Sequence, residues 1–369
     1  MPEILTVNVN NKPAYDIYIT RGFSKLPDRI KDAGLEGKKA FIVTDTQVEG
    51  LYAEAVKEEL SKVCPFVTVY AFPFGEKNKN LETVQTILKA MTEARFNRDD
   101  LVVALGGGVA GDIAGFCSAI YMRGIDVIQI PTTLLAQVDS SIGGKTGVDL
   151  DAYKNMVGAF KMPSLVYINI DTLKTLDGRQ YASGMAEVLK YGLIMDEAFY
   201  EWLISRIYEI NERDEEVLTE MIKTCCECKQ KIVEKDPLEK GDRALLNFGH
   251  TIGHAIEKYK NFELLHGECV ALGSVAAAFI SWKKEKITRD EYYEIRDMFV
   301  PFDLPISIED IDPDEIIRLT KSDKKASSDG IKFILLKKAG KAYIDRNVSD
   351  DDLRAGIDEI WFSDEDKRE

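Results

Sequence analysis

The sequence predicts an α/β protein in two domains: an amino-terminal domain, residues 1–180, built on a parallel sheet, and a mainly α-helical domain, residues 181–369. In the first part, short runs rich in β-branched residues alternate with segments of helical periodicity, which is the pattern of βαβ units covered on both faces. After about residue 183 the strand-like runs give way to long helical periodicity. The 369 residues also exceed one ordinary core, since a domain holds roughly 100–200 residues.

The first elements expected are the two strands of a β-hairpin, 4–9 and 14–19, which flank the turn residues Asn10-Asn11-Lys12-Pro13. The strands that follow are short apolar runs of the kind found in buried parallel sheets. They are expected at 40–44, 66–72, 101–105, 127–130 and 165–170. Helical periodicity at 51–64 and 81–95 falls between these strands.

The second part is expected to be helical, with one late exception. Apolar positions recur at helical spacing over 185–194, 198–211, 215–235, 251–259 and 268–284. Two β-like runs, 332–336 and 342–345, flank a Lys-Ala-Gly turn and predict a small hairpin.

Composition and charge exclude several classes of function. Hydrophobic residues make up 45% and charged residues 30%, as in folded globular proteins. The formal charge of −15 repels nucleic acid and anionic lipid, so a phosphorylated ligand requires a local cluster of Lys and Arg. No uninterrupted apolar run of 18 residues or signal peptide is visible, so we expect no membrane partner and a cytoplasmic location.

A glycine-rich turn follows the strand expected at 101–105. Residues 106–112, Gly-Gly-Gly-Val-Ala-Gly-Asp, have the spacing G-x-G-x-x-G that lets a backbone approach a pyrophosphate at a helix start. The usual acidic residue about 20 positions later is missing, so a ligand-free tight turn remains an alternative. Asp45 and the segment 75–79, Gly-Glu-Lys-Asn-Lys, also follow expected strands, and open α/β sheets bind their ligands at that edge.

The three histidines of the chain, His250, His254 and His266, lie within 17 residues. His250 and His254 are spaced i, i+4 and share one face of the expected helix. Two imidazoles and a carboxylate with an open position would hold a divalent metal, although the spacing does not say which two bind it. Glu187 is the best carboxylate candidate, with Lys190 three residues later, because a charge among apolar neighbours is costly to bury unpaired. Core or capping histidines are the alternative.

Taken together, these segments resemble the 3-dehydroquinate synthases, within the wider group of sugar phosphate cyclases. The matching stretches keep the order of that family and are residues 75–79, 106–115, 121–124, 131–145, 154–155, 184–190, 247–254 and 266–268. The resemblance implies conversion of 3-deoxy-D-arabino-heptulosonate 7-phosphate to 3-dehydroquinate and phosphate, a step of the shikimate pathway. It implies transient oxidation at C5 by NAD, loss of phosphate, re-reduction and an intramolecular aldol closure.

The resemblance implies a Rossmann-like NAD-binding domain followed by a metal- and substrate-binding domain. The metal, Zn²⁺ or Co²⁺, would be held by Glu187, His250 and His266. The catalytic positions would be His254, which accepts a proton, with Glu239, Lys190 and Asp139. The NAD contacts would be Asp45, Glu76, Lys79, Gly107, Gly108, Asp112, Thr132, Thr133, Lys154, Thr172 and Thr175.

The same resemblance implies a phosphorylated sugar acid as substrate and a homodimer. The substrate contacts would be Lys145, Asn155, Lys229, Arg243, Asn247 and one of Lys324 or Lys325, with Arg123 reaching the phosphate from the neighbouring subunit. Cations are needed at both ends of such a substrate because it carries a carboxylate and a phosphate. Ser183 and Pro237 depart from the commonest residues of the family.

Three alternatives are weighed against this hypothesis. The first is another sugar phosphate cyclase such as 2-deoxy-scyllo-inosose synthase, whose substrate lacks the carboxylate; Lys229 and Arg243 speak against it. The second is a metal-dependent polyol dehydrogenase of the glycerol dehydrogenase kind, which would make net NADH; residues 131–145 speak against it. The third is an inactive NAD-binding or regulatory protein, which the intact histidines and Glu187 disfavour.

Overall fold

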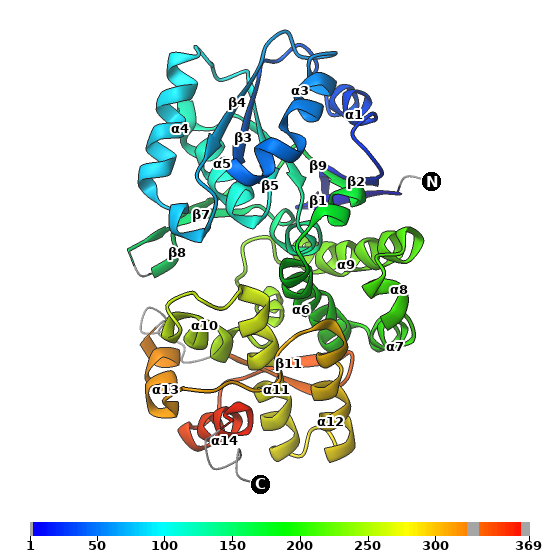
Figure 1. Ribbon diagram of the computed structural model, residues 1–369, viewed down its shortest axis with the longest axis vertical. Coiled ribbons are helices and arrows are strands. Elements are labelled where there is room, and N and C mark those ends of the chain that lie inside the picture. Colours follow the sequence, from blue (N-terminus) through cyan, green and yellow to red (C-terminus); the bar gives the residue numbers. More distant parts are fainter. Residues whose placement is uncertain (1–2, 152, 323–331, 363–369) are drawn as a thin grey trace. The chain divides into compact units, whose positions relative to one another are not determined.

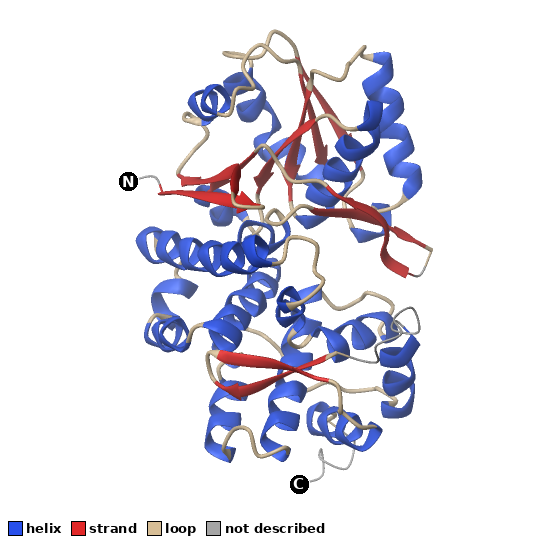
Figure 2. Cartoon of the chain, turned by 180° about the vertical axis from the view of Figure 1, so that it is seen from behind, coloured by secondary structure: helices blue, strands red, loops and turns tan. Residues whose placement is uncertain are grey.

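The computed structural model describes residues 3–151, 153–322 and 332–362. The chain divides into two compact units. Unit 1 contains Met1–Leu176 and Leu218–Leu238, and unit 2 contains Asp177–Val217 and Glu239–Glu369. Figures 1 and 2 show the sheet of unit 1 and the helices of unit 2. Over the described ranges no helix is apolar and long enough to span a membrane.

A seven-stranded sheet forms the centre of unit 1 as described, in the order β1-β2-β9-β6-β5-β3-β4 (Figure 1). Only β1 and β2 pair antiparallel, and the other pairs are parallel. The strands are β1 Glu3–Val9, β2 Lys12–Thr20, β3 Ala40–Asp45, β4 Val67–Phe72, β5 Leu101–Gly106, β6 Asp126–Pro131 and β9 Leu165–Asn169. All seven expected strands are therefore present, with bounds within two residues of those predicted.

Two hydrophobic clusters cover the two faces of this sheet. Residues on alternate positions of β3 go to opposite clusters, since Ile42 joins one while Phe41 and Val43 join the other. The first face is covered by α1 Leu26–Asp32 and α3 Glu54–Leu60, and the second by α4 Leu81–Glu93 and α5 Gly108–Ile120. The helix expected at 51–64 begins earlier, as the continuous run of α2 Thr46–Val48, η1 Glu49–Ala53 and α3, because Asp45 caps it.

Several elements around the glycine turn were not predicted. They include a second hairpin, β7 Lys145–Leu150 with β8 Tyr153–Phe160. Short helical turns lie at η2 Glu76–Asn78, η3 Tyr121–Arg123, η4 Ala136–Ser140 and η5 Ile170–Thr175. The motif at 131–145 leads from β6 through η4 into this hairpin.

The predicted boundary at residue 180 is corrected in one segment. Most of α9, Glu215–Lys235, belongs to unit 1 although it lies among the helices of the second part of the sequence. It is held there by specific polar contacts with the first strand, because Lys223 pairs with Glu3 at 2.9 Å and Glu234 accepts the backbone N–H of Asn8 at 2.8 Å. A boundary predicted from a change in composition along the sequence cannot show that one later helix packs on the edge of the sheet.

Unit 2 is helical, with the small predicted hairpin of β10 Phe333–Lys338 and β11 Lys341–Asp345. Its helices are α6 Gly178–Met195, α7 Glu197–Ser205, α8 Ile207–Asn211, α10 His250–Tyr259, α11 His266–Lys283, α12 Arg289–Asp297, α13 Pro313–Ser322 and α14 Asp350–Ile360, with 3₁₀ turns η6 Asp242–Asn247 and η7 Val300–Phe302. The helix α11 is apolar on every side and is therefore buried almost throughout, packed by α6, α10, α12, α14 and β10.

Candidate functional site

The three histidines and Glu187 converge in unit 2. His250 is the first residue of α10, His254 follows one turn later, and His266 is the first residue of α11. Their ligand atoms lie within 4.8 Å of one another, and the ring centroids are 5.1–5.7 Å apart. Glu187 reaches the same point from the middle of α6, because its Oε1 lies 3.5 Å from Nε2 of His250 and 3.4 Å from Nε2 of His266. The structure therefore places these four side chains next to one another, and their role as metal ligands stays a prediction.

This donor set fits a divalent metal ion. In a tetrahedral site with bonds of about 2.0–2.1 Å, neighbouring ligand atoms are separated by roughly 3.3–3.4 Å. The Glu187 to His250 and Glu187 to His266 separations are close to that value. The other ring nitrogen of His250, Nδ1, lies 2.9 Å from the carbonyl oxygen of Phe248, which leaves Nε2 as its ligand atom.

The charges at this centre are strongly coupled. Glu187 and Lys190 are each 1% exposed and form an ion pair one turn apart on α6. Burial lowers the pKa of His250 to about 3, against the opposing charge of Glu187. Burial also disfavours the charged form of His266, but hydrogen bonds to Glu187 and Glu257 outweigh it and raise its pKa to about 9. A site that shifts the pKa values of two neighbouring imidazoles in opposite directions is typical of a functional centre.

Close helix contacts set the position of these groups. The backbone N–H of Gly267 donates to Oγ of Ser183 at 2.9 Å, and a Cβ at Gly267 would overlap the carbonyl of Ser183. Ser183 lies one turn before Glu187, so this contact fixes Glu187 against His266. At the same crossing Arg179 donates to both carboxylate oxygens of Glu268, at 2.6 and 2.8 Å. Ser183, which departs from the commonest residue of the family, thus still supplies a hydrogen-bonding group where α6 crosses α11.

The glycine turn of unit 1 joins β5 to α5 beside Asp45. Gly106 has φ +151°, and a Cβ on it would lie 2.7 Å from Cβ of Ala110 and 3.6 Å from Oδ2 of Asp45. Gly107 and Gly108 approach Thr133 and Ser140 just as closely, at 3.0 and 3.2 Å from a hypothetical Cβ. The structure therefore brings Asp45, Gly107, Gly108 and Thr133 together at the carboxyl ends of β3, β5 and β6. Gly107 and Gly108 are half-buried at the start of α5, the kind of helix end whose backbone N–H groups can bind an anion.

Asp45 also has a local structural role. Its Oδ1 accepts the backbone N–H groups of Gln47 and Val48, both at 2.9 Å, and so caps α2. Burial raises the pKa of this carboxyl, and the two hydrogen bonds partly offset the effect. One oxygen serves the helix while the other is directed toward the glycine turn.

A network of charged and polar side chains around the buried Lys79 joins five of the predicted residues. Nζ of Lys79 lies 2.6 Å from Oδ2 of Asp112 and donates to Oδ1 of Asn155 at 2.6 Å. Lys154 pairs with Glu76 at 3.2 Å. Burial by itself lowers the pKa of Lys79, but the charges of Asp112 and Glu76 outweigh it, so its pKa lies above the usual value. Lys79 is therefore held as a cation, 5% exposed, at the foot of the β7–β8 hairpin.

Lys229 of α9 is 4% exposed and lies 2.7 Å from Oδ1 of Asp139 in η4. This pairing explains why Lys229 belongs to unit 1. Thr132 donates its backbone N–H to Gly106 at 2.9 Å, which connects the motif at 131–145 with the glycine turn. Thr172 accepts from Gln137 at 3.0 Å in η5, and Thr175 hydrogen-bonds Tyr52.

The remaining predicted residues are placed as follows. In unit 2, Arg243 is 1% exposed in η6, and Asn247 donates to Oε1 of Glu239 at 3.2 Å. In unit 1, Lys145 is an exposed residue at the start of β7, and Arg123 is an exposed residue in η3 with φ +70°. Lys324 and Lys325 lie outside the described residues.

Glu257 was missed by the sequence analysis. It is 3% exposed on α10, and its Oε1 lies 3.9 Å from Nδ1 of His266. The spacing of four residues from Gly249 through Gly253 to Glu257 places all three on one face of a helix and could have revealed it.

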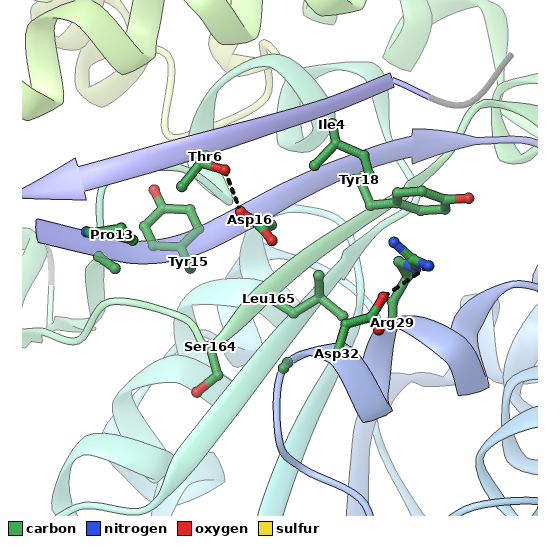
Figure 3. A pocket seen from close by; sticks show the side chains of 12 residues that line it. Ile4, Thr6, Pro13, Tyr15, Asp16, Tyr18, Arg29, Asp32, Ser164 and Leu165 are labelled. Atoms are coloured by element: carbon green, nitrogen blue, oxygen red, sulfur yellow. Dashed lines mark hydrogen bonds and ion pairs between the residues drawn. The ribbon is translucent and has the colours of Figure 1, made fainter.

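A pocket of about 200 Å³ in unit 1 contains none of the predicted site residues (Figure 3). It lies between β1, β2 and α1, and four of its polar side chains form two pairs with one another. Thr6 donates to Asp16 at 2.6 Å, and Arg29 pairs with Asp32 at 2.8 Å while lying over the ring of Tyr18. We assign no ligand to this pocket.

Comparisons with known proteins agree with this geometry. Residues 69–183 match the family profile "3-dehydroquinate synthase N-terminal", and residues 184–326 match "3-dehydroquinate synthase C-terminal". A 3-dehydroquinate synthase of Acetivibrio thermocellus is 44% identical over 349 residues, covering 95% of this chain and 96% of that protein.

Two solved structures are similar over almost the whole chain. A 2-epi-5-epi-valiolone synthase from Streptomyces hygroscopicus subsp. jinggangensis, with NAD⁺ and Zn²⁺ bound, is 25% identical with a TM-score of 0.87, covering 96% of this chain and 99% of that one. A 2-deoxy-scyllo-inosose synthase complexed with carbaglucose-6-phosphate, NAD⁺ and Co²⁺ is 25% identical with a TM-score of 0.85, covering 97% and 99%.

Proposed function

The chain belongs to the 3-dehydroquinate synthase family, and we propose that it converts 3-deoxy-D-arabino-heptulosonate 7-phosphate to 3-dehydroquinate and phosphate. The observation that carries the proposal is the Glu187, His250 and His266 centre, which has the donor types and spacings of a catalytic metal site. The choice of substrate is supported by the similarity to curated 3-dehydroquinate synthases over nearly the whole chain.

In unit 2, Glu187, His250 and His266 would hold Zn²⁺ or Co²⁺, the ions named for the two similar structures. A bound divalent ion supplies a Lewis acid that makes a substrate hydroxyl more acidic. His254, the third imidazole of the cluster and half-buried, is placed to accept the hydroxyl proton. Lys190 neutralises Glu187 and keeps that carboxylate ionised in a buried position.

In unit 1, the residues at the carboxyl ends of the strands would hold NAD. NAD supplies a hydride acceptor that later returns the hydride, so no net oxidation occurs. The bare backbone of Gly107 and Gly108 admits a pyrophosphate, and the second oxygen of Asp45 is available for ribose hydroxyls. Glu76, Lys79, Asp112 and Lys154 form a charged network beside that turn, and the other contacts are Thr132, Thr133, Thr172 and Thr175.

The anionic substrate requires cations, and both units provide them buried. Lys229, which pairs with Asp139, and Arg243 are assigned to the carboxylate and the ring. Asn247, which donates to Glu239, is assigned to the same substrate. Lys145 and Asn155 are assigned to the phosphate, together with Lys324 or Lys325.

We further propose a homodimer in which Arg123 contacts the phosphate bound by the neighbouring subunit. Arg123 and Met122 both have positive φ, +70° and +47°, and both side chains are exposed. Such a backbone persists only when something over-determines it, which favours a functional position. We also propose a cytoplasmic location, where NAD and phosphorylated sugars are available.

The principal alternative is 2-deoxy-scyllo-inosose synthesis, which the similarity to one such synthase supports. The two substrates differ in the carboxylate, and the chain has buried cations for such a group, Lys229 in unit 1 and Arg243 in unit 2, which favours the sugar acid. A metal-dependent polyol dehydrogenase would instead accumulate NADH.

The test incubates the metal-loaded protein with 3-deoxy-D-arabino-heptulosonate 7-phosphate and catalytic NAD, and follows phosphate release together with absorbance of NADH. The proposal expects phosphate over many turnovers without accumulated NADH. NADH rising in step with substrate loss would establish a dehydrogenase, and turnover only with glucose 6-phosphate would establish the other cyclase. If the same assay is run on the ligand variant His266→Gln, its matched control is Glu263→Gln, an exposed change on the loop before His266.

A further inference from the structure

We infer that Glu257 is a positioning residue of the metal centre, holding the imidazole of His266 so that its Nε2 faces the ion. This inference rests on the proposed metal site, and it concerns a residue outside the set of ligands.

The helices α10 and α11 form an antiparallel pair whose seam is made of glycines. A Cβ on Gly253 would lie 2.7 Å from the carbonyl oxygen of Cys269, and one on Gly249 would lie 2.7 Å from that of Val270. Positions further along α10 therefore contact earlier positions of α11, since Gly249 meets Val270 and Gly253 meets Cys269. The next position of this face after Gly249 and Gly253 is Glu257, and it meets the start of α11 at His266.

A buried glutamate is unusual in a helix contact made by glycines, and its presence there requires a compensating interaction. Glu257 is 3% exposed, and its neighbours on the same face are glycines that bring the backbones together. Burying an ionised carboxylate costs several kcal/mol unless a partner compensates it. Its Oε1 lies 3.9 Å from Nδ1 of His266, which is within ion-pair range. His266 is thus one such partner at this end of the seam.

The two metal-binding imidazoles are then held by the same principle. His250 has Nε2 toward Glu187 and Nδ1 at 2.9 Å from the carbonyl oxygen of Phe248. His266 has Nε2 toward the same oxygen of Glu187 and Nδ1 toward Glu257. A hydrogen bond accepted from Nδ1–H fixes the tautomer and orientation of a ligand histidine and makes Nε2 a better donor. Nδ1 of His250 is hydrogen-bonded to a backbone carbonyl, and Nδ1 of His266 faces a carboxylate at ion-pair distance.

Charge balance supports the carboxylate at the second position. A divalent ion beside Glu187 and Lys190 leaves two positive charges in a buried site, since those two residues cancel each other. Glu257 reduces this excess to one without occupying a coordination position. A substrate oxygen can therefore approach an ion whose remaining charge is partly compensated from behind His266.

The experiment measures metal binding directly, by competition between the full-length protein and a chelator for Zn²⁺. Glu257→Gln keeps the shape and removes the charge, and we expect the Zn²⁺ dissociation constant to rise roughly 10–100-fold. Glu263→Gln removes the same charge from an exposed position on the adjoining loop and serves as the control. A Glu257→Gln protein that binds Zn²⁺ within twofold of that control would overturn the inference.

Two further measurements separate positioning from general stability. With Co²⁺ bound, the visible ligand-field spectrum should change in Glu257→Gln and stay unchanged in Glu263→Gln, because only the former alters ligand geometry. The second uses ¹⁵N spectra of the wild-type protein with Zn²⁺, which are simple because the chain has three histidines. We expect His266 to be protonated at Nδ1, and an unprotonated or metal-bound Nδ1 overturns the inference even if the variant does not fold.

None of these readouts requires turnover. A protein that passes all three and yet releases no phosphate from the sugar acid contradicts the proposed reaction and supports the role of Glu257. A protein that turns over normally but shows no effect at Glu257 contradicts the role alone.

Discussion

Replacing Gly253 with alanine tests whether the metal centre depends on the close approach of α10 and α11. Gly253 lies between His250 and His254 on α10. An added Cβ would lie 2.7 Å from the carbonyl oxygen and 3.0 Å from the carbonyl carbon of Cys269, and 3.3 Å from the backbone nitrogen of Val270. These are backbone atoms inside α11, so no side chain can rotate to make room.

The size of the effect follows from those distances. Carbon and oxygen atoms in van der Waals contact are separated by roughly 3.3 Å or more, so the helices must separate by about 0.6 Å. Overpacking of this kind costs about 1–3 kcal/mol. For a unit of this size the midpoint of thermal unfolding should fall by about 2–4 °C for each kcal/mol. The separation also moves His250 away from His266, and displacements of about 0.5 Å already impair a metal site.

We therefore expect Gly253→Ala to unfold at a lower temperature without metal and to bind Zn²⁺ at least about tenfold more weakly in a chelator competition. Gly178→Ala is the matched control, because in the described part of the chain no atom lies within 4 Å of the added Cβ. That control should melt within a degree or two of wild type and bind Zn²⁺ normally. Wild-type melting together with wild-type Zn²⁺ affinity in Gly253→Ala would refute the packing argument.

Three other predictions concern ligands, subunits and pH. His266→Ala should lose bound metal and activity while keeping the circular dichroism of wild type, and full metal content at wild-type turnover would remove it from the ligand set. Arg123→Ala should turn over poorly, and mixing it with an inactive His250→Ala protein should partly restore phosphate release; no restoration at any ratio argues against shared sites. Burial opposes ionisation of Asp126, but hydrogen bonds from Lys38 and Ser164 outweigh it and hold its pKa below the usual value. The stability that ionised Asp126 contributes is therefore present above its unfolded-state pKa and is lost as pH falls through its folded-state pKa. Asp126→Asn should lower the free energy of unfolding in urea by up to about 1 kcal/mol at pH 7. This loss should shrink below about pH 4.

The parallel strands were the most predictable part of the fold. Strands buried on both faces are short, continuous and apolar, and β3, β5, β6 and β9 all have that pattern. The β7–β8 hairpin was missed because each of its strands contains a glycine, a residue that is depleted in strands, and neither strand is a continuous apolar run. The placement of α9 was missed because its contacts with β1 involve residues more than 200 positions apart.

The sequence by itself determined which residues could carry the chemistry. Three histidines in one short window, a glutamate on an apolar helix and glycines after a buried strand restrict the possible sites to a few residues, because such groups are costly to bury without a function. It also determined that a phosphorylated ligand would need local cations in an acidic protein.

Only the tertiary structure decided which atoms of those residues face each other. Close helix crossings, at Gly253 and at Gly267, bring Glu187 to Nε2 of two histidines and place Glu257 behind one of them. The same holds for Lys79, whose partners Asp112 and Asn155 come from a separate helix and hairpin. Sequence spacing fixes neighbours within one helix, whereas the distance between two helices depends on the side chains that separate them, and here glycines remove that separation.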